Sequence, residues 1–394
     1  MHVRGWIKDV MYGLIIFGIC AALILVVSVA ADNIAAKHNA VIVSKNVNSN
    51  LDYDDSLCMS VDNVSGSEND ENVNLACDGK EQDNNNINDK KIACWGDSIT
   101  YGLGGQENTY IKSEAGIIDA SNWNYPDTLR YYTGMDVYNL GVCGETSYEI
   151  ALRQGGIKMY VGKQVTVKPG KRTQISIVDE SGNPVILENF NGYETDNQQP
   201  ENVVYINDIP FKLEYDNSRI YISIYDNAVD KSVKLKKGSQ IITKAAHDIS
   251  GDVLVIQMGS NGGWNDYDEL IEQYKAMIAN SGTECYIIIG DTDNPEESVD
   301  SANYTSSQEI GTDDSMWEAA LREAFGEHFI NMRTYLLENA LNIAGLEPTQ
   351  MDEEDLLQGR VPETIKYDYT HLNSYGYYAI GYGVYEKGLE LGYW

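Results

Sequence analysis

Three short apolar runs, each ending at a glycine, constrain the fold of this chain more than any other feature. They occupy residues 91–96, 253–259 and 285–290. Short apolar runs bounded by turn residues are typical of strands that are buried on both faces. A helical pattern separates two of the runs at Tyr267–Ile278, where apolar residues recur at helical spacing. Strands that alternate with helices predict a parallel sheet with helices on both faces.

A serine, a histidine and an aspartate stand at positions that suit nucleophilic catalysis. Ser98 follows the first apolar run directly after a Gly-Asp turn, and Asp368 lies three residues before His371 near the C-terminus. A serine hydroxyl needs a base to accept its proton, and that base needs a carboxylate to orient its ring. The three residues therefore match a serine-hydrolase triad. Taken singly, each segment is more simply a turn or a helix cap.

Two further segments offer donors for a negatively charged oxygen. Gly144 lies in residues 139–147, which follow a strand-like run, and Asn261 follows the run that begins at Val253. The backbone N–H groups of Ser98 and Gly144, with the Asn261 amide, would form an oxyanion hole. Each such donor contributes about 3–4 kcal/mol to lowering the barrier. Gly144 suits this place because a missing Cβ lets a substrate approach the backbone.

In this order, the four segments resemble the SGNH (GDSL-like) hydrolases over residues 90–160 and 245–394. The residues that match the family's blocks are Ser98, Gly144, Asn261 and His371, with Asp368 as the triad carboxylate. Two positions depart from the pattern: Ile99 replaces the leucine of the family name, and Gly262 stands where many members have Asp. The resemblance implies a flavodoxin-like α/β fold and a serine esterase. It also implies short acyl groups, such as acetyl, on carbohydrate as the substrate, and no cofactor.

The N-terminal region indicates where the protein works. Residues Val10–Ala31 are almost uninterruptedly apolar, and about 20 such residues cross a bilayer. Basic residues precede this run and Asp32 follows it, which predicts a single-pass anchor with the catalytic part outside the cell. The alternative is a cleaved signal peptide and a secreted enzyme, because Ser28–Ala30 fits a small-x-small cleavage site. We expect residues 1–32 to be this membrane anchor or signal segment.

Residues 33–90 are rich in Asn and Asp and poor in large apolar side chains. Such a segment cannot bury enough surface to offset the entropy of ordering, so we expect a disordered acidic stalk. The net charge of the chain is −32, which argues against nucleic acid as a partner, because that would require a basic patch. No His/Cys cluster has the spacing of metal ligands. A disulfide between Cys94 and Cys143 is conceivable, because they flank the two predicted site turns.

Between residues 158 and 244 the pattern changes to short β-branched and aromatic runs separated by turn residues. This is typical of an all-β insertion, and it divides the predicted catalytic domain into residues 91–157 and 245–394. Two roles are open for the insertion. It binds or gates a glycan through exposed aromatics such as Tyr193 or Tyr205, or it forms a structural lid or dimer surface.

The sequence leaves more than one function open. The first is an exported esterase that acts on a small-molecule or glycan ester. The second is an O-acyltransferase, which passes the acyl group to a sugar hydroxyl. The third is a surface glycan-binding protein whose catalytic core is vestigial. The intact set of four segments favours an enzyme over the binding protein.

Overall fold

The structure is a computed structural model. It describes residues 90–113, 116–185, 202–216, 219–303 and 315–394. The predicted anchor or signal segment and the predicted stalk lie outside these residues. Within the described ranges, no helix combines the length and the apolar character needed to cross a membrane.

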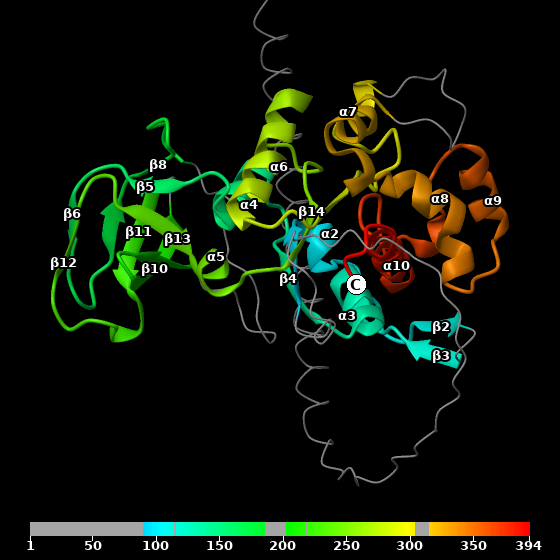
Figure 1. Cartoon of the computed structure of the whole chain (residues 1–394), viewed down its shortest axis with the longest axis horizontal. Helices are drawn as coiled ribbons and strands as arrows, with labels where there is room; N and C mark the ends of the chain where they lie inside the picture. Colours follow the sequence, from blue (N-terminus) through cyan, green and yellow to red (C-terminus); the bar gives the residue numbers. More distant parts are fainter. Residues whose placement is uncertain (1–89, 114–115, 186–201, 217–218, 304–314) are drawn as a thin grey trace, which may run out of the picture. The chain divides into compact units, whose positions relative to one another are not determined.

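A five-stranded parallel sheet organises the larger part of the fold (Figure 1). Its strands are β1 (Lys91–Gly96), β4 (Asp136–Gly141), β14 (Val253–Gln257), β15 (Tyr286–Ile289) and β16 (Phe329–Ile330). In space they are ordered β16–β15–β14–β1–β4. Counted along the chain, this order is 2-1-3-4-5, which reverses direction between β1 and β14. Ligands of open α/β sheets bind at such a reversal, beyond the carboxyl ends of the strands.

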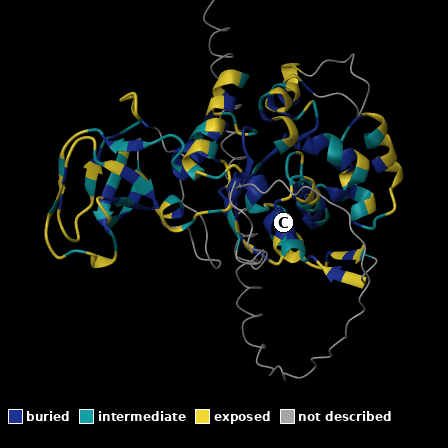
Figure 2. Ribbon diagram, in the orientation of Figure 1, coloured by how far each residue is buried: buried dark blue, intermediate teal, exposed yellow. Residues whose placement is uncertain are grey.

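Helices cover both faces of this sheet, as the sequence pattern predicts. Side chains alternate between the faces along a strand, so Ile92 and Cys94 of β1 pack in one core while Ala93 and Trp95 pack in the other. The first core is closed by α3 (Tyr125–Thr133), α8 (Met332–Ile343) and α10 (Ser374–Glu390). The second is closed by α4 (Ser147–Gln154), α6 (Tyr267–Ser281) and α7 (Met316–Phe325). Figure 2 shows the strands as buried ribbon with helices that are exposed on their outer sides.

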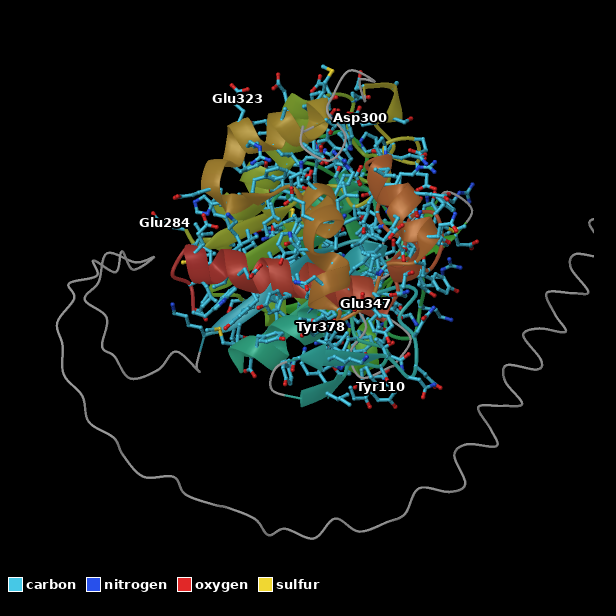
Figure 3. The ribbon with its side chains drawn as sticks, turned by 90° about the vertical axis from the view of Figure 1, so that its right-hand side faces the viewer. Tyr110, Glu284, Asp300, Glu323, Glu347 and Tyr378 are labelled. Atoms are coloured by element: carbon cyan, nitrogen blue, oxygen red, sulfur yellow. The ribbon has the colours of Figure 1, made fainter. Side chains whose placement is uncertain are left out.

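Local capping explains where these helices begin and end. Thr146 and Glu149 form a capping box at the start of α4, and Gly155 ends the helix in a left-handed conformation. These caps account for both ends of α4. The tyrosines of α10 serve in packing. Tyr378, labelled in Figure 3, reaches from α10 to α3 and shares a hydrogen bond with the Tyr132 hydroxyl.

Residues 159–243 form a separate antiparallel region, which lies away from the parallel sheet in Figure 1. Its larger sheet has the order β7–β11–β10–β9–β13–β5–β8, and β12 pairs with β6. These strands are β5 (Met159–Val161), β6 (Val165–Val167), β7 (Thr173–Ile175), β8 (Ile177–Val178), β9 (Val203–Ile206), β10 (Ile209–Asp216), β11 (Arg219–Ile224), β12 (Val233–Leu235) and β13 (Gln240–Thr243). The region has its own apolar core, in which Phe211 and Ile222 are fully buried.

Several short elements complete the described chain. They are β2 (Tyr110–Ser113) and β3 (Gly116–Asp119), which pair as antiparallel strands, the helices α2 (Ser98–Tyr101), α5 (Lys244–Asp248) and α9 (Gln350–Leu357), and four 3₁₀ turns. The 3₁₀ turns span Tyr225–Asn227, Ser301–Asn303, Gly326–His328 and Glu363–Ile365. Of these elements, α2 matters most for the site, because it begins at Ser98.

Candidate active site

The serine of the site stands at the point where β1 turns into α2. Gly96 ends the strand, Asp97 caps the helix and Ser98 is the first helical residue. The Asp97 carboxylate accepts a hydrogen bond of 3.0 Å from the Ile99 N–H. A Cβ at Gly96 would lie 2.1 Å from the Thr100 side-chain oxygen. The turn is therefore possible only with glycine at this position, and it presents Ser98 at the carboxyl edge of the sheet.

A short loop near the C-terminus brings an imidazole to this serine. The Nε2 atom of His371 lies 2.9 Å from the Ser98 Oγ atom. The loop is closed by hydrogen bonds from the N–H groups of Tyr367 and Asp368 to the His371 carbonyl. Two residues 273 positions apart in the chain thus meet at hydrogen-bond distance. This is the contact that a serine nucleophile and its base require.

Asp368 holds both the ring and the backbone of the histidine. Its carboxylate lies 2.9 Å from His371 Nδ1, and it accepts hydrogen bonds from the N–H groups of Thr370 and His371. Partial burial acts to raise the pKa of Asp368, but these hydrogen bonds outweigh burial and hold the pKa below its usual range. An ionised Asp368 keeps the Nδ1 proton in place, so that Nε2 faces Ser98 as an acceptor.

The turns after β4 and β14 lie side by side at the same edge. Gly96 of β1 pairs in register with Gly141 of β4 on one side and with Gln257 of β14 on the other. The turn after β4 places Gly144 at a positive φ of 78°. The Asn261 amide donates to the carbonyl of Glu145 at 3.1 Å.

A second pair of contacts joins the same two turns. Ser147 donates both its N–H and its hydroxyl to the Gly262 carbonyl, at 3.0 and 3.1 Å. The structure therefore joins Ser98, His371 and Asp368 in one hydrogen-bonded chain. It also links Asn261 to the turn of Gly144 through the carbonyl of Glu145, the next residue. The sheet register brings the two groups to one edge.

Two charged residues beside these turns were missed in the sequence. Glu145 and Arg153 form an ion pair with a shortest separation of 2.7 Å, and both side chains are fully buried. Burial raises the pKa of Glu145 to about 7, and the Arg153 guanidinium opposes the rise. The two residues stand eight positions apart, one in a turn and the other in a helix, so no local periodicity connects them.

A group of buried carboxyls under the site was also missed. Asp97, Asp291 and Asp293 are almost completely buried. Burial raises the pKa of Asp97 to about 7 and that of Asp291 to about 6. Burial, together with the charges of Asp291 and Asp97, raises the pKa of Asp293 to about 9. These carboxyls follow β1 and β15, and their burial depends on helices that a strand pattern does not reveal.

Two expectations about individual residues need correction or qualification. No disulfide joins Cys94 and Cys143: Cys94 is buried in the core, whereas Cys143 is exposed. Cys285, by contrast, is disulfide-bonded. The Tyr205 ring, expected to be open for a glycan, is stacked on His247 with ring centroids 3.9 Å apart. Tyr193 lies outside the described residues.

Among the residues that the structure describes, no group of three or more His, Cys, Asp or Glu side chains is arranged to hold a metal ion. Comparison of the chain with protein-family models, curated proteins and solved structures finds no match in any of the three.

Proposed function

We propose that this chain is a serine hydrolase of the SGNH type, which cleaves ester bonds through an acyl-enzyme. The observation that carries the proposal is the hydrogen-bonded chain from Ser98 through His371 to Asp368. The strand order 2-1-3-4-5 supports a flavodoxin-like sheet, which is the fold that the sequence resemblance implies. Four sequence segments far apart in the chain supply the site residues in the order expected for this family.

In the proposed first half-reaction, the Ser98 oxygen attacks the ester carbonyl carbon while His371 Nε2 takes the serine proton. The carbonyl electron pair moves onto oxygen and gives a tetrahedral intermediate. As that pair returns, the bond to the alcohol breaks, and His371 gives its proton to the leaving oxygen. Water then attacks the acyl-Ser98 ester with His371 again as the base, which releases the acid.

The negative oxygen of each intermediate needs donors that are already in position. The N–H of Ser98 is at the first position of α2, where a helix offers no internal acceptor. We assign the Gly144 N–H and the Asn261 amide as the other two donors. An amide carries two N–H groups, and the hydrogen bond of Asn261 to the Glu145 carbonyl uses one of them.

Substrate and location follow from the sequence. We propose short acyl groups, such as acetyl, on carbohydrate as the substrate, with the catalytic part outside the cell. The apolar segment at residues 10–31 supports export, either as a membrane anchor or as a cleaved signal. The strongly acidic chain suits a neutral glycan ester better than a polyanion.

The test is hydrolysis of an aryl acetate by the purified full-length protein. We expect Ser98→Ala to lower turnover by about 10⁴-fold or more, as for the loss of other triad nucleophiles. Ser113→Ala is the control and should leave turnover unchanged. It removes a hydroxyl that donates a hydrogen bond to the Gly116 carbonyl on the β2–β3 pair. A fluorophosphonate probe should label Ser98 in the wild type. Labelling at another residue, or turnover that survives in Ser98→Ala, would refute the proposal.

A second measurement separates hydrolysis from acyl transfer. The same reaction is run with a neutral oligosaccharide in excess, and the products are analysed by mass spectrometry. Free acetate alone supports the esterase. An acetylated sugar that depends on Ser98 would show the transferase instead. Binding of the oligosaccharide without any Ser98-dependent turnover would favour a glycan-binding protein.

A further inference from the structure

One buried ion pair contacts the three segments that carry Ser98, Gly144 and Asn261. We call Glu145 and Arg153 the site ion pair. Arg153 Nε lies 2.9 Å from both carboxylate oxygens of Glu145, and its Nη2 atom lies 2.7 Å from one of them. Both side chains are fully inaccessible to solvent. The proposed reaction has no use for either residue as acid, base or nucleophile, so their presence needs another explanation.

The guanidinium also contacts the ends of two strands. Its Nη2 atom donates to the Leu140 carbonyl at 2.7 Å and makes a longer contact of 3.4 Å with the Gly96 carbonyl. It lies over the Trp95 ring, 5.0 Å from the ring centroid. Gly96 and Trp95 lie just before the Asp97–Ser98 turn, whereas Leu140 precedes the turn that carries Gly144. One rigid, planar cation thus connects the nucleophile turn with the Gly144 turn.

The carboxylate partner extends this connection to the third turn. Glu145 directly follows Gly144, so the pairing of its side chain restricts the turn in which the Gly144 N–H lies. The carbonyl of Glu145 accepts the hydrogen bond from the Asn261 amide. Glu145 is therefore held at its side chain by Arg153 and at its carbonyl by Asn261, one residue after the Gly144 N–H.

Stability alone is a poor explanation for this arrangement. Removing two charges from water costs several kcal/mol for each ion, and apolar replacements of buried pairs are often neutral or stabilising. The pair can instead fix the orientation of the groups that it contacts, because a guanidinium donates hydrogen bonds in a fixed planar fork. Oxyanion stabilisation depends on such fixed orientation, since the donors must be in place before the charge develops.

We infer that Glu145 and Arg153 are positioning residues that aim the Gly144 N–H and the Asn261 amide at the oxyanion formed on Ser98. The inference rests on the proposed function and deepens it. Neither residue touches the reacting atoms. They act on kcat by holding the donors, and they leave the binding of the neutral substrate largely unaffected.

The molecule contains a matched control for this idea. Glu318 of α7 and Arg333 of α8 form a second buried pair, here called the helix ion pair. Arg333 donates from Nε and Nη2 to the two carboxylate oxygens of Glu318, at 3.0 and 2.8 Å, and both side chains are nearly inaccessible. The helices α7 and α8 carry none of the five predicted site residues. The two pairs share their chemistry and their burial, but they differ in what they hold.

The experiment compares the two pairs in the full-length protein. Glu145→Gln keeps the size of the side chain and removes its charge, and Arg153→Lys keeps the charge and removes the fork. Glu318→Gln and Arg333→Lys are the matched controls. For each variant we measure kcat and KM with an aryl acetate and the melting temperature. We also measure the affinity for phenylboronic acid, which forms a tetrahedral adduct on an active serine.

We expect the site-pair variants to lower kcat by about 10- to 100-fold, less than the loss of a whole oxyanion donor, while KM stays within about threefold. Affinity for the boronic acid should fall in parallel with kcat/KM, because the adduct resembles the charged intermediate. The helix-pair variants should lower the melting temperature and keep kcat within about threefold. A purely structural role would not produce this division between kcat and KM.

Three outcomes overturn the inference. The first is a folded Glu145→Gln protein that keeps wild-type kcat, and the second is an equal loss of kcat from both pairs. If Arg153→Lys does not fold, the nearly isosteric Glu145→Gln still decides between these results. The third is a wild-type protein without Ser98-dependent turnover, which would refute the proposed function as well. A loss confined to the site pair supports the inference.

Discussion

The parallel-sheet region and the antiparallel region at residues 159–243 bury very different side chains. The first encloses several charged residues, among them Asp97, Glu145, Arg153 and Asp291. Among the described residues of the second, Thr243 is the only polar side chain that is buried. An apolar core holds strands together at little electrostatic cost, whereas buried charges are expensive unless each is paired. Ordinary apolar packing therefore stabilises the antiparallel region, whereas the parallel region also encloses charged groups beside the proposed site.

We expect the strongest effect on turnover from the triad carboxylate that we propose in the parallel-sheet region. Asp368→Asn replaces a carboxylate that accepts from Nδ1 by an amide that also donates, which favours the wrong tautomer of His371. We expect kcat for an aryl acetate to fall by about 10³- to 10⁴-fold, in line with the same change in other triads. Asp119→Asn is the control, because Asp119 also accepts hydrogen bonds from a neighbouring residue, Ser121, but lies on β3.

A loss of less than about tenfold in Asp368→Asn would show that the carboxylate is dispensable. The Ser98–His371 contact would then act as a dyad. A melting temperature measured beside kcat distinguishes this result from collapse of the loop, which Asp368 also holds through the N–H groups of Thr370 and His371.

In the antiparallel region we expect a loss of stability without a loss of turnover. Phe211 is fully buried in the core of that region, so Phe211→Ala should lower the free energy of unfolding by about 3–5 kcal/mol. Turnover of a small aryl acetate should stay within about twofold, because Phe211 holds no site turn. Hydrogen exchange of peptides from β10 and β11 would report the lost stability locally.

Loss of turnover in a folded Phe211→Ala protein would contradict this separation. It would mean that the antiparallel region shapes the site as well as packing its own core. Phe211→Leu is the graded control, since it keeps most of the buried volume and should lie between the wild type and the alanine variant in stability.

The smallest effect is a change in how stability depends on pH. Asp293 has a pKa raised to about 9 by burial and nearby carboxylates, so the folded protein holds its proton more tightly than the unfolded chain. The stability from this group is complete below the unfolded pKa near 4 and is lost as pH rises through about 9. As pH rises from 5 to 8, the free energy of unfolding of Asp293→Asn should therefore increase relative to that of the wild type. The increase should be up to about 1 kcal/mol per pH unit.

Urea unfolding at several pH values measures this relative gain directly. The pH dependence from Asp368 has the opposite sign, because its pKa is lowered in the folded protein. Its contribution to the free energy of unfolding is present above the unfolded pKa and is lost as pH falls through the folded pKa. A wild type and an Asp293→Asn variant with parallel stability curves across this window would rule out a buried, protonated Asp293.

Local patterns in the sequence were sufficient for much of the fold. The strands beginning at Lys91 and Val253, and the helix beginning at Tyr267, follow from apolar runs and apolar spacing that lie within a few residues of one another. The triad contact was predicted because its members carry distinctive chemistry. The structure adds its distances.

The features that the sequence did not predict depend on contacts outside any local pattern. The Glu145–Arg153 pair joins a turn to α4, and no local pattern in the sequence marks the burial of Asp291 and Asp293 beyond β15. The bridge between Cys94 and Cys143 was suggested by their places beside two turns. It fails because a strand directs alternate side chains to opposite faces, and Cys94 points into the core.

The strands at which the antiparallel region begins and ends determine how readily the region could be replaced. β5 and β13 are hydrogen-bonded neighbours, with Met159 opposite Ile241, so the chain leaves the parallel region and returns to it about 5 Å apart. The whole region is therefore inserted into the parallel fold as a single loop whose two ends are neighbours. A short turn, or a different domain with adjacent termini, could replace it without altering the order of the five parallel strands.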